Sequence, residues 1–182
     1  MDQLDILRVQ ARRKASELHD ALALEPAGPV VAVFKNDAYG VFAVAGEVAR
    51  GTSFFVGGLE LGNNGKAARE LVLLTPGADV AERHGEAVPL ESLPAGISAG
   101  DVVAAHFEQA PYGAFTITGV AVASPRSDDL LVGSWFITVD GIASPRLVSV
   151  DVLARAAEHD IPAPRTMSSW AGGTDGAVDA QA

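Results

Sequence analysis

The run from Val30 to Phe34 reads VVAVF, an apolar stretch without the polar alternation of a strand that has one solvent face. An unbroken run of this length and β-branched content is typical of a strand covered on both faces, as in a parallel sheet. Similar runs follow at 52–56 and 71–75, and we interpret the apolar stretch at 41–50 as a short helix. The order strand, helix, strand, turn, strand predicts βαβ units and an α/β fold.

An amphipathic helix is expected before the first of these strands, over residues 3 to about 24. Its apolar residues recur at helical spacing, and Arg8, Arg12, Arg13, Glu17 and Asp20 lie between them. The apolar positions are Leu4, Leu7, Ala11, Leu18 and Leu22. The helix ends at the segment 25–29, EPAGP, because two prolines and a glycine do not continue it.

The character of the sequence changes after Gly77. Four segments rich in Val, Ile, Phe, Thr and Trp follow, separated by turns with no helix between them, and they predict an antiparallel meander or a small barrel. These segments are 101–107, 114–123, 130–139 and 147–150. We therefore predict an α/β region at 1–86, a small β domain at 87–160 and a disordered tail at 161–182.

The end of the predicted β domain allows two interpretations. Ser149 could cap a helix from Val150 to His159, or the apolar residues 147–153 could prolong the fourth strand. We favour the helix because the alanines at 154, 156 and 157 are poor strand residues.

Composition excludes several classes of function. The net charge is −10, with no cluster of Lys and Arg beyond residues 12–14, so the chain does not resemble a nucleic-acid-binding protein. The absence of cysteine excludes disulfides, thiolate metal sites and a cysteine nucleophile. With no signal peptide and no membrane-spanning apolar run, we expect a cytoplasmic protein that binds no membrane.

A lysine follows the first apolar strand directly. Lys35 would lie at the carboxyl end of a parallel strand, where open sheets and β/α barrels bind ligands. Its amine would there be positioned for Schiff-base chemistry. Tyr39 would enter the next helix and could offer its hydroxyl to a phosphate. Without further context, a strand-end lysine in solvent, followed by a turn, explains the same residues.

The segment Lys35-Asn36-Asp37-Ala38-Tyr39-Gly40 resembles the cofactor-lysine motif of the alanine racemase family, and the similarity extends over about residues 4–76. The resemblance implies a truncated, TIM-barrel-like domain that binds pyridoxal phosphate. Lys35 would be the catalytic and cofactor-binding lysine, and Tyr39 would lie near the phosphate. The implied activity is that of an isomerase acting on a small amino acid.

The other candidate sites have structural interpretations. The four histidines show no metal-ligand spacing, so no metal site is expected. The glycines at 57, 58, 62 and 65 are interpreted as a loop, and Asp128 with Asp129 as a hairpin turn. The segments 134–136 and 111–113 could form an aromatic contact surface, although Trp135, Ile137 and Val139 also alternate as a buried strand face should.

Two functional hypotheses follow. The first is a racemase-like enzyme that uses Lys35 and pyridoxal phosphate. The second is a non-enzymatic binding or assembly protein, in which a truncated racemase-like domain is fused to the β domain. Either one would expose strand edges, so we expect self-association or a partner chain.

Overall fold

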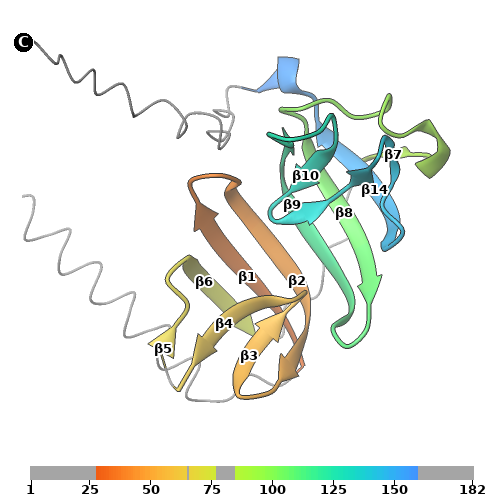
Figure 1. Cartoon of the computed structure of the whole chain (residues 1–182). Coiled ribbons are helices and arrows are strands. Elements are labelled where there is room, and N and C mark those ends of the chain that lie inside the picture. The colour runs from red at the N-terminus through yellow and green to blue at the C-terminus, as the bar shows by residue number, and fades with distance from the viewer. Residues whose placement is uncertain (1–27, 65, 77–84, 160–182) are drawn as a thin grey trace, which may run out of the picture.

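The computed structural model describes residues 28–64, 66–76 and 85–159. These residues form strands and turns, and their only helical elements are the short 3-10 turns η1 (Leu90–Ser92) and η2 (Ala156–Glu158) (Figure 1). The strands of the first part are β1 (Pro29–Asn36), β2 (Gly40–Arg50), β3 (Ser53–Val56), β4 (Leu59–Asn63), β5 (Lys66–Ala67) and β6 (Leu71–Pro76). Those of the second part are β7 (Glu86–Val88), β8 (Val102–Gln109), β9 (Gly113–Ala123), β10 (Leu130–Val132), β11 (Trp135–Phe136), β12 (Thr138–Val139), β13 (Ile142–Ala143) and β14 (Leu147–Ala154).

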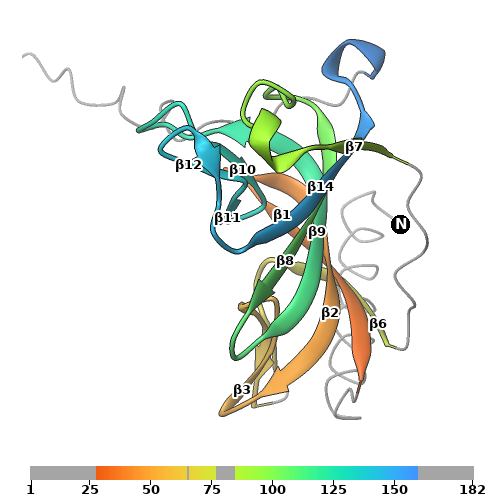
Figure 2. The same cartoon turned by 90° about the vertical axis from the view of Figure 1, so that its right-hand side faces the viewer.

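Within the described residues, one antiparallel sheet contains all of these strands except β12 and β13, which pair with each other. Its central path runs β5-β4-β3-β2-β9-β8-β14-β7. Beside this path, β1 pairs with β2 and β6 pairs with β1, while β10 pairs with β9 and β11 pairs with β10. Figures 1 and 2 show the short strands β3 to β5 at one end of the long strands and the ribbons β10 to β12 at the other.

The expectation of an α/β, TIM-barrel-like first part is wrong. The stretch expected to form a helix at 41–50 is instead the long strand β2, which pairs antiparallel with β1, β3 and β9. Its Phe42 and Val44 face the core while Val41 and Ala43 face the other way. Bonding to strands on both edges outweighs the helix propensity of its alanines, because propensity is a weak local preference.

The lysine motif itself is a hairpin turn. The Oδ1 atom of Asn36 accepts hydrogen bonds from the backbone N–H groups of Ala38 at 2.7 Å and Tyr39 at 3.3 Å. Gly40 follows with φ +72°, a conformation that favours glycine. The segment therefore reverses the chain into an antiparallel partner, and no helix follows it.

Most predicted strands are confirmed, with different pairings. The runs at 30–34, 52–56 and 71–75 form β1, β3 and β6, but β1 and β6 are antiparallel. The segment 130–139 is broken into three short strands, since Gly133, with φ +55°, turns the chain between β10 and β11. The short strand β5 lies between the strands β4 and β6 in the sequence.

The helix expected from Val150 to His159 is also wrong, and the alternative of a prolonged strand is confirmed by β14. Val150 and Val152 face the core, and they pair with β7 on one side and β8 on the other. The segment therefore keeps the alternation of side chains, every second one inward, that defines a strand. Two further predictions, the helix at 3–24 and the tail at 161–182, concern residues outside the described ranges.

A continuous core joins the two predicted regions. The rings of Phe34 and Phe42 stack at 5.6 Å, and those of Phe107 and Phe115 stack at the same separation. All four belong to one cluster of buried apolar residues. Since β2 pairs with β9, the expected boundary at 86/87 falls within a single sheet.

Candidate functional site

Lys35 and Tyr39, the two residues named by the lysine motif, lie in different surroundings. Lys35 is exposed on β1 opposite Val41, and its backbone N–H donates to the carbonyl oxygen of Glu70 at 2.8 Å. Tyr39 is half-buried, packs against the core cluster and lines a surface hollow. Lys35 lines neither of the hollows described below.

These residues do not fit a pyridoxal phosphate site. A Schiff-base lysine needs a desolvated amine facing a pocket, and the side chain of Lys35 is exposed. The helix N-terminus that was expected to hold the phosphate is a hairpin turn in which Asn36 already binds the backbone N–H groups. The geometry around Lys35 therefore supports no catalytic step with this cofactor.

His106 takes part in a polar ladder across three strands. Its Nδ1 atom lies 2.7 Å from Oγ1 of Thr116, and its Nε2 atom lies 3.4 Å from Oδ2 of Asp151. Hydroxyl, imidazole and carboxylate occur in this order in nucleophilic hydrolases. Thr116, however, is only 5 % exposed, and none of the three residues lines either hollow, so we assign the ladder to cross-strand pairing.

Asp129 has the structural role expected for a turn residue. Its carboxylate accepts hydrogen bonds from Oγ of Ser127 at 2.7 Å and from the backbone N–H of Gly141 at 3.1 Å. These two bonds lower the pKa of Asp129 below its usual value of 3.8, against a smaller effect of burial that raises it. The side chain therefore ties the start of β10 to the β12–β13 hairpin.

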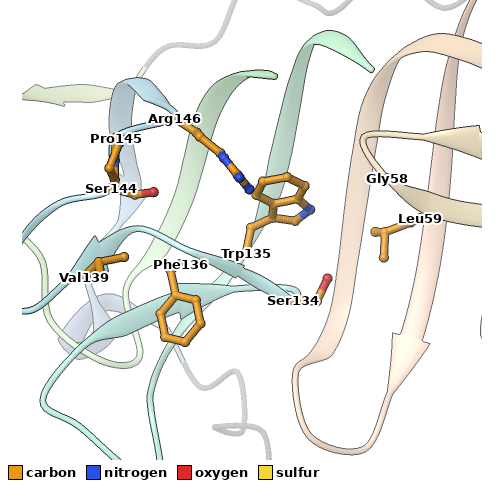
Figure 3. Close-up of a pocket in the computed structure, with 9 residues that line it drawn as sticks. All are labelled: Gly58, Leu59, Ser134, Trp135, Phe136, Val139, Ser144, Pro145 and Arg146. Carbon is orange, nitrogen blue, oxygen red and sulfur yellow. The ribbon is translucent and has the colours of Figure 1, made fainter. Parts of the chain in front are cut away.

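A surface hollow lies between the β3–β4 turn and the ribbons that follow β10. It has a volume of about 560 Å³, within the range of ligand-binding clefts. Its lining residues are Gly58, Leu59, Ser134, Trp135, Phe136, Val139, Ser144, Pro145 and Arg146. Figure 3 shows Leu59 on one side, Phe136 and Val139 on the other, and Trp135 between them. We call this space the Trp135 hollow.

A second hollow of about 210 Å³ adjoins the first. Its lining residues are Ala38, Tyr39, Val122, Ala123, Ser124, Pro125, Arg126, Leu131, Ser134 and Phe136. Ser134 and Phe136 line both spaces, so they form the partition between them. We call the second space the Tyr39 hollow, and the two together the Phe136 site.

Trp135 is held firmly in place. Its indole Nε1 donates a hydrogen bond to the carbonyl oxygen of Gly57 at 3.1 Å. Its ring lies 5.3 Å from that of Phe107 and 5.0 Å from that of Phe115, the latter in an edge-on arrangement. Gly58 packs beneath the rings of Trp135 and Tyr112, since a Cβ there would lie 3.4 Å and 3.2 Å from them. The floor of the Trp135 hollow is thus preorganised.

Phe136 contrasts with its neighbour. Its side chain is 41 % exposed between the two hollows, and Val139 beside it is 36 % exposed, whereas Ile137 is fully buried. Of the two segments expected to form an aromatic contact surface, 134–136 exposes the ring of Phe136, whereas Trp135 and Tyr112 pack against the core cluster. The alternative was a buried strand face made of Trp135, Ile137 and Val139. Of these three residues only Ile137 is fully buried, because the chain turns sharply around these short strands.

Each hollow has one charged residue in its lining, and in both cases it is an arginine. Arg146 lines the Trp135 hollow, and Arg126 lines the Tyr39 hollow. Arg146 donates from Nη1 to Oε1 of Gln109 at 3.1 Å, and within the described part of the chain neither guanidinium forms an ion pair. In a chain of net charge −10, two such cations beside apolar surfaces favour an anionic ligand.

Comparisons with protein-family models, curated proteins and solved structures found no match. Among the described residues, no three His, Asp or Glu side chains are grouped to hold a metal ion. The same part of the chain has no helix long and apolar enough to cross a membrane. Fold and site together define the class as an antiparallel β protein with a surface aromatic site.

Proposed function

We propose that this chain is a non-enzymatic binding protein that recognises an extended, acidic and apolar segment of a partner chain at the Phe136 site. The observation that carries the proposal is the position of Phe136, a large apolar side chain exposed between two hollows that each contain one arginine. Exposed aromatic residues and arginine are enriched where protein surfaces bind partners.

Shape favours an extended chain over a compact ligand. The two hollows lie side by side and share a wall, so an occupant of both must span Phe136. In an extended peptide, alternate side chains point the same way and are spaced about 7 Å apart. Two apolar side chains at positions i and i+2 can therefore enter the two hollows.

The two arginines also restrict the charge of the partner segment. Arg126 and Arg146 can each form charge-assisted hydrogen bonds to a carboxylate. Pairing at the rim of a solvated hollow adds modest affinity, but it selects strongly against a basic segment. We expect aspartate or glutamate beside the apolar residues of the partner.

Two probes test this function. The first is the dye anilinonaphthalene sulfonate, an apolar anion whose fluorescence rises in such hollows. The second is a peptide with leucines at positions i and i+2 flanked by aspartates, compared by calorimetry with the same peptide carrying lysines in place of the aspartates. The aspartate peptide should bind at least tenfold more tightly, a difference of about 1.4 kcal/mol.

Variants separate the site from nonspecific apolar binding. Phe136→Ser should weaken both probes at least tenfold, and Arg146→Gln should reduce the preference for the aspartate peptide. Val148→Ser is the matched control, because Val148 is 56 % exposed and lines neither hollow. Equal binding of the two peptides, or equal effects of Phe136→Ser and Val148→Ser, would overturn the proposal.

A further inference from the structure

The backbone of Phe136 lies on an edge of the β10–β11 hairpin that has no strand beside it. In this hairpin Phe136 lies opposite Leu131. The next pair along is hydrogen-bonded, since the backbone N–H of Ile137 donates to the carbonyl oxygen of Leu130 at 2.8 Å. Because bonded and unbonded pairs alternate along an antiparallel ladder, the pair of Leu131 and Phe136 is an unbonded one. The N–H and C=O groups of Phe136 therefore point away from β10.

Among the residues that the structure describes, none bonds to these two backbone groups. Strand β11 pairs with β10 alone, and no turn or loop bond involves Phe136. The Trp135 hollow lies on this free side of β11, because Phe136 and residues 144–146 line it and no residue of β10 does (Figure 3). An unpaired donor and an unpaired acceptor of the main chain therefore face the hollow.

The segment 144–146, which lines the same hollow, uses its backbone groups elsewhere. The carbonyl oxygen of Ser144 accepts a hydrogen bond from the N–H of Leu147 at 2.9 Å, and that of Arg146 accepts one from β8 at 3.1 Å. Between them, Pro145 has no N–H to donate. The segment is thus held in its own turn, and it leaves the edge of β11 open to the hollow.

We propose that the partner segment binds as an added strand on the free edge of β11, with its backbone bonded to Phe136. This inference rests on the proposed function, because the occupant is the same extended, acidic and apolar segment, selected by the charges of Arg126 and Arg146. To enter both hollows the segment spans Phe136, which brings its middle residue, at position i+1, level with the free N–H and C=O groups. Strand addition gives bonds that any sequence can form, while the hollows and the arginines select the side chains.

N-methylation of the aspartate peptide tests this pairing, because each methyl group removes one N–H donor. The N–H groups of neighbouring residues in an extended chain point in opposite directions, so only one of two neighbours can bond to β11. Methylation should weaken binding to the full-length chain at least fivefold at i+1 if the segment is antiparallel, or at i+2 if it is parallel. At the other of these two positions it should change binding less than twofold. Equal losses at both positions, or no loss at either, would exclude strand addition.

Amide hydrogen exchange, followed by NMR, gives a second measurement on the unaltered chain. The amide of Phe136 should exchange at least tenfold more slowly when the aspartate peptide is bound. The amide of Ile137 is the control, since it is bonded to Leu130 and should be protected without the peptide. If the peptide binds and the Phe136 amide stays unprotected, strand addition is wrong and the proposed function stands. If the peptide does not bind, both are wrong.

Discussion

The indole of Trp135 and the carbonyl group of Gly57 are joined by a hydrogen bond of 3.1 Å across 78 positions of sequence. The bond connects the β3–β4 turn to β11, so it links the sheet to the ribbon that carries Phe136. Because the ring also packs against Phe107 and Phe115, the site rests on the core. Binding at the Phe136 site is therefore expected to depend on the stability of this contact.

Trp135→Phe should lower the free energy of unfolding by about 1 kcal/mol. The phenyl ring keeps much of the apolar contact but leaves the carbonyl oxygen of Gly57 without its donor. Urea denaturation followed by circular dichroism measures the change. Phe136→Ser is the control, since Phe136 is exposed and its replacement should change stability by less than about 0.5 kcal/mol. A larger loss in the control than in Trp135→Phe would contradict this account.

Gly57→Ala should destabilise the protein more than Gly113→Ala. Both glycines have positive φ, +52° and +69°, so alanine is strained by about 1 kcal/mol at either position. At Gly57 the added Cβ would also lie 2.6 Å from Cδ2 of Phe115, whereas at Gly113 it would meet nothing within 4 Å. The additional overpacking at Gly57 should cost about 1–3 kcal/mol. Thermal unfolding of the two variants compares them directly, and equal melting temperatures would contradict the packing argument.

The free energy of unfolding should depend on pH at low pH because of Asp101. Burial raises the pKa of this carboxyl, but bonds from the N–H groups of Ser98 and Ala156 and from the guanidinium of Arg155 outweigh it, so its pKa lies below 3.8. Because the pKa of Asp101 is lower in the folded chain than in the unfolded chain, its ionised form stabilises the fold at any pH above the unfolded-state pKa. This stabilisation is lost as the pH falls through the folded-state pKa, where the carboxylate becomes protonated. Stability should therefore fall as pH drops below about 4.

Asp101→Asn tests this assignment. The variant should lose about 2 kcal/mol at pH 7, since Asp101 is only 2 % exposed and its bonds are charge-assisted. The difference from the natural chain should shrink as the pH falls below 4, as measured by urea denaturation across that range. Asp128→Asn is the matched control, because Asp128 is exposed. A difference that is independent of pH would show that the charge of Asp101 is not the cause.

Added pyridoxal phosphate should show no visible absorbance that depends on Lys35. The amine is exposed and faces neither hollow, so it reacts no more readily than other surface lysines. Spectra of the natural chain and of Lys35→Ala with the cofactor, after dialysis, measure this directly. Lys66→Ala provides the control at another exposed lysine. Absorbance lost in Lys35→Ala alone would restore the racemase-like hypothesis.

The sequence by itself determined where most strands lie. Runs such as 71–75 and 114–123 are apolar, β-branched and bounded by turn residues, and these properties act over a few neighbouring positions. It also indicated an aromatic surface at 134–136. The strand-to-helix turn expected at 35–40 was wrong, because Asn36 and Gly40 serve a hairpin turn as well as they would serve a turn into a helix.

Only the tertiary structure decided how the strands pair and what surrounds each candidate residue. The apolar stretch 41–50 suits a helix or a strand, and its pairing with both β1 and β9 selects the strand. The Phe136 site likewise combines residues from five separate stretches, around Tyr39, Leu59, Val122, Trp135 and Arg146. Such contacts depend on register and packing between distant segments, and local patterns carry no information about them.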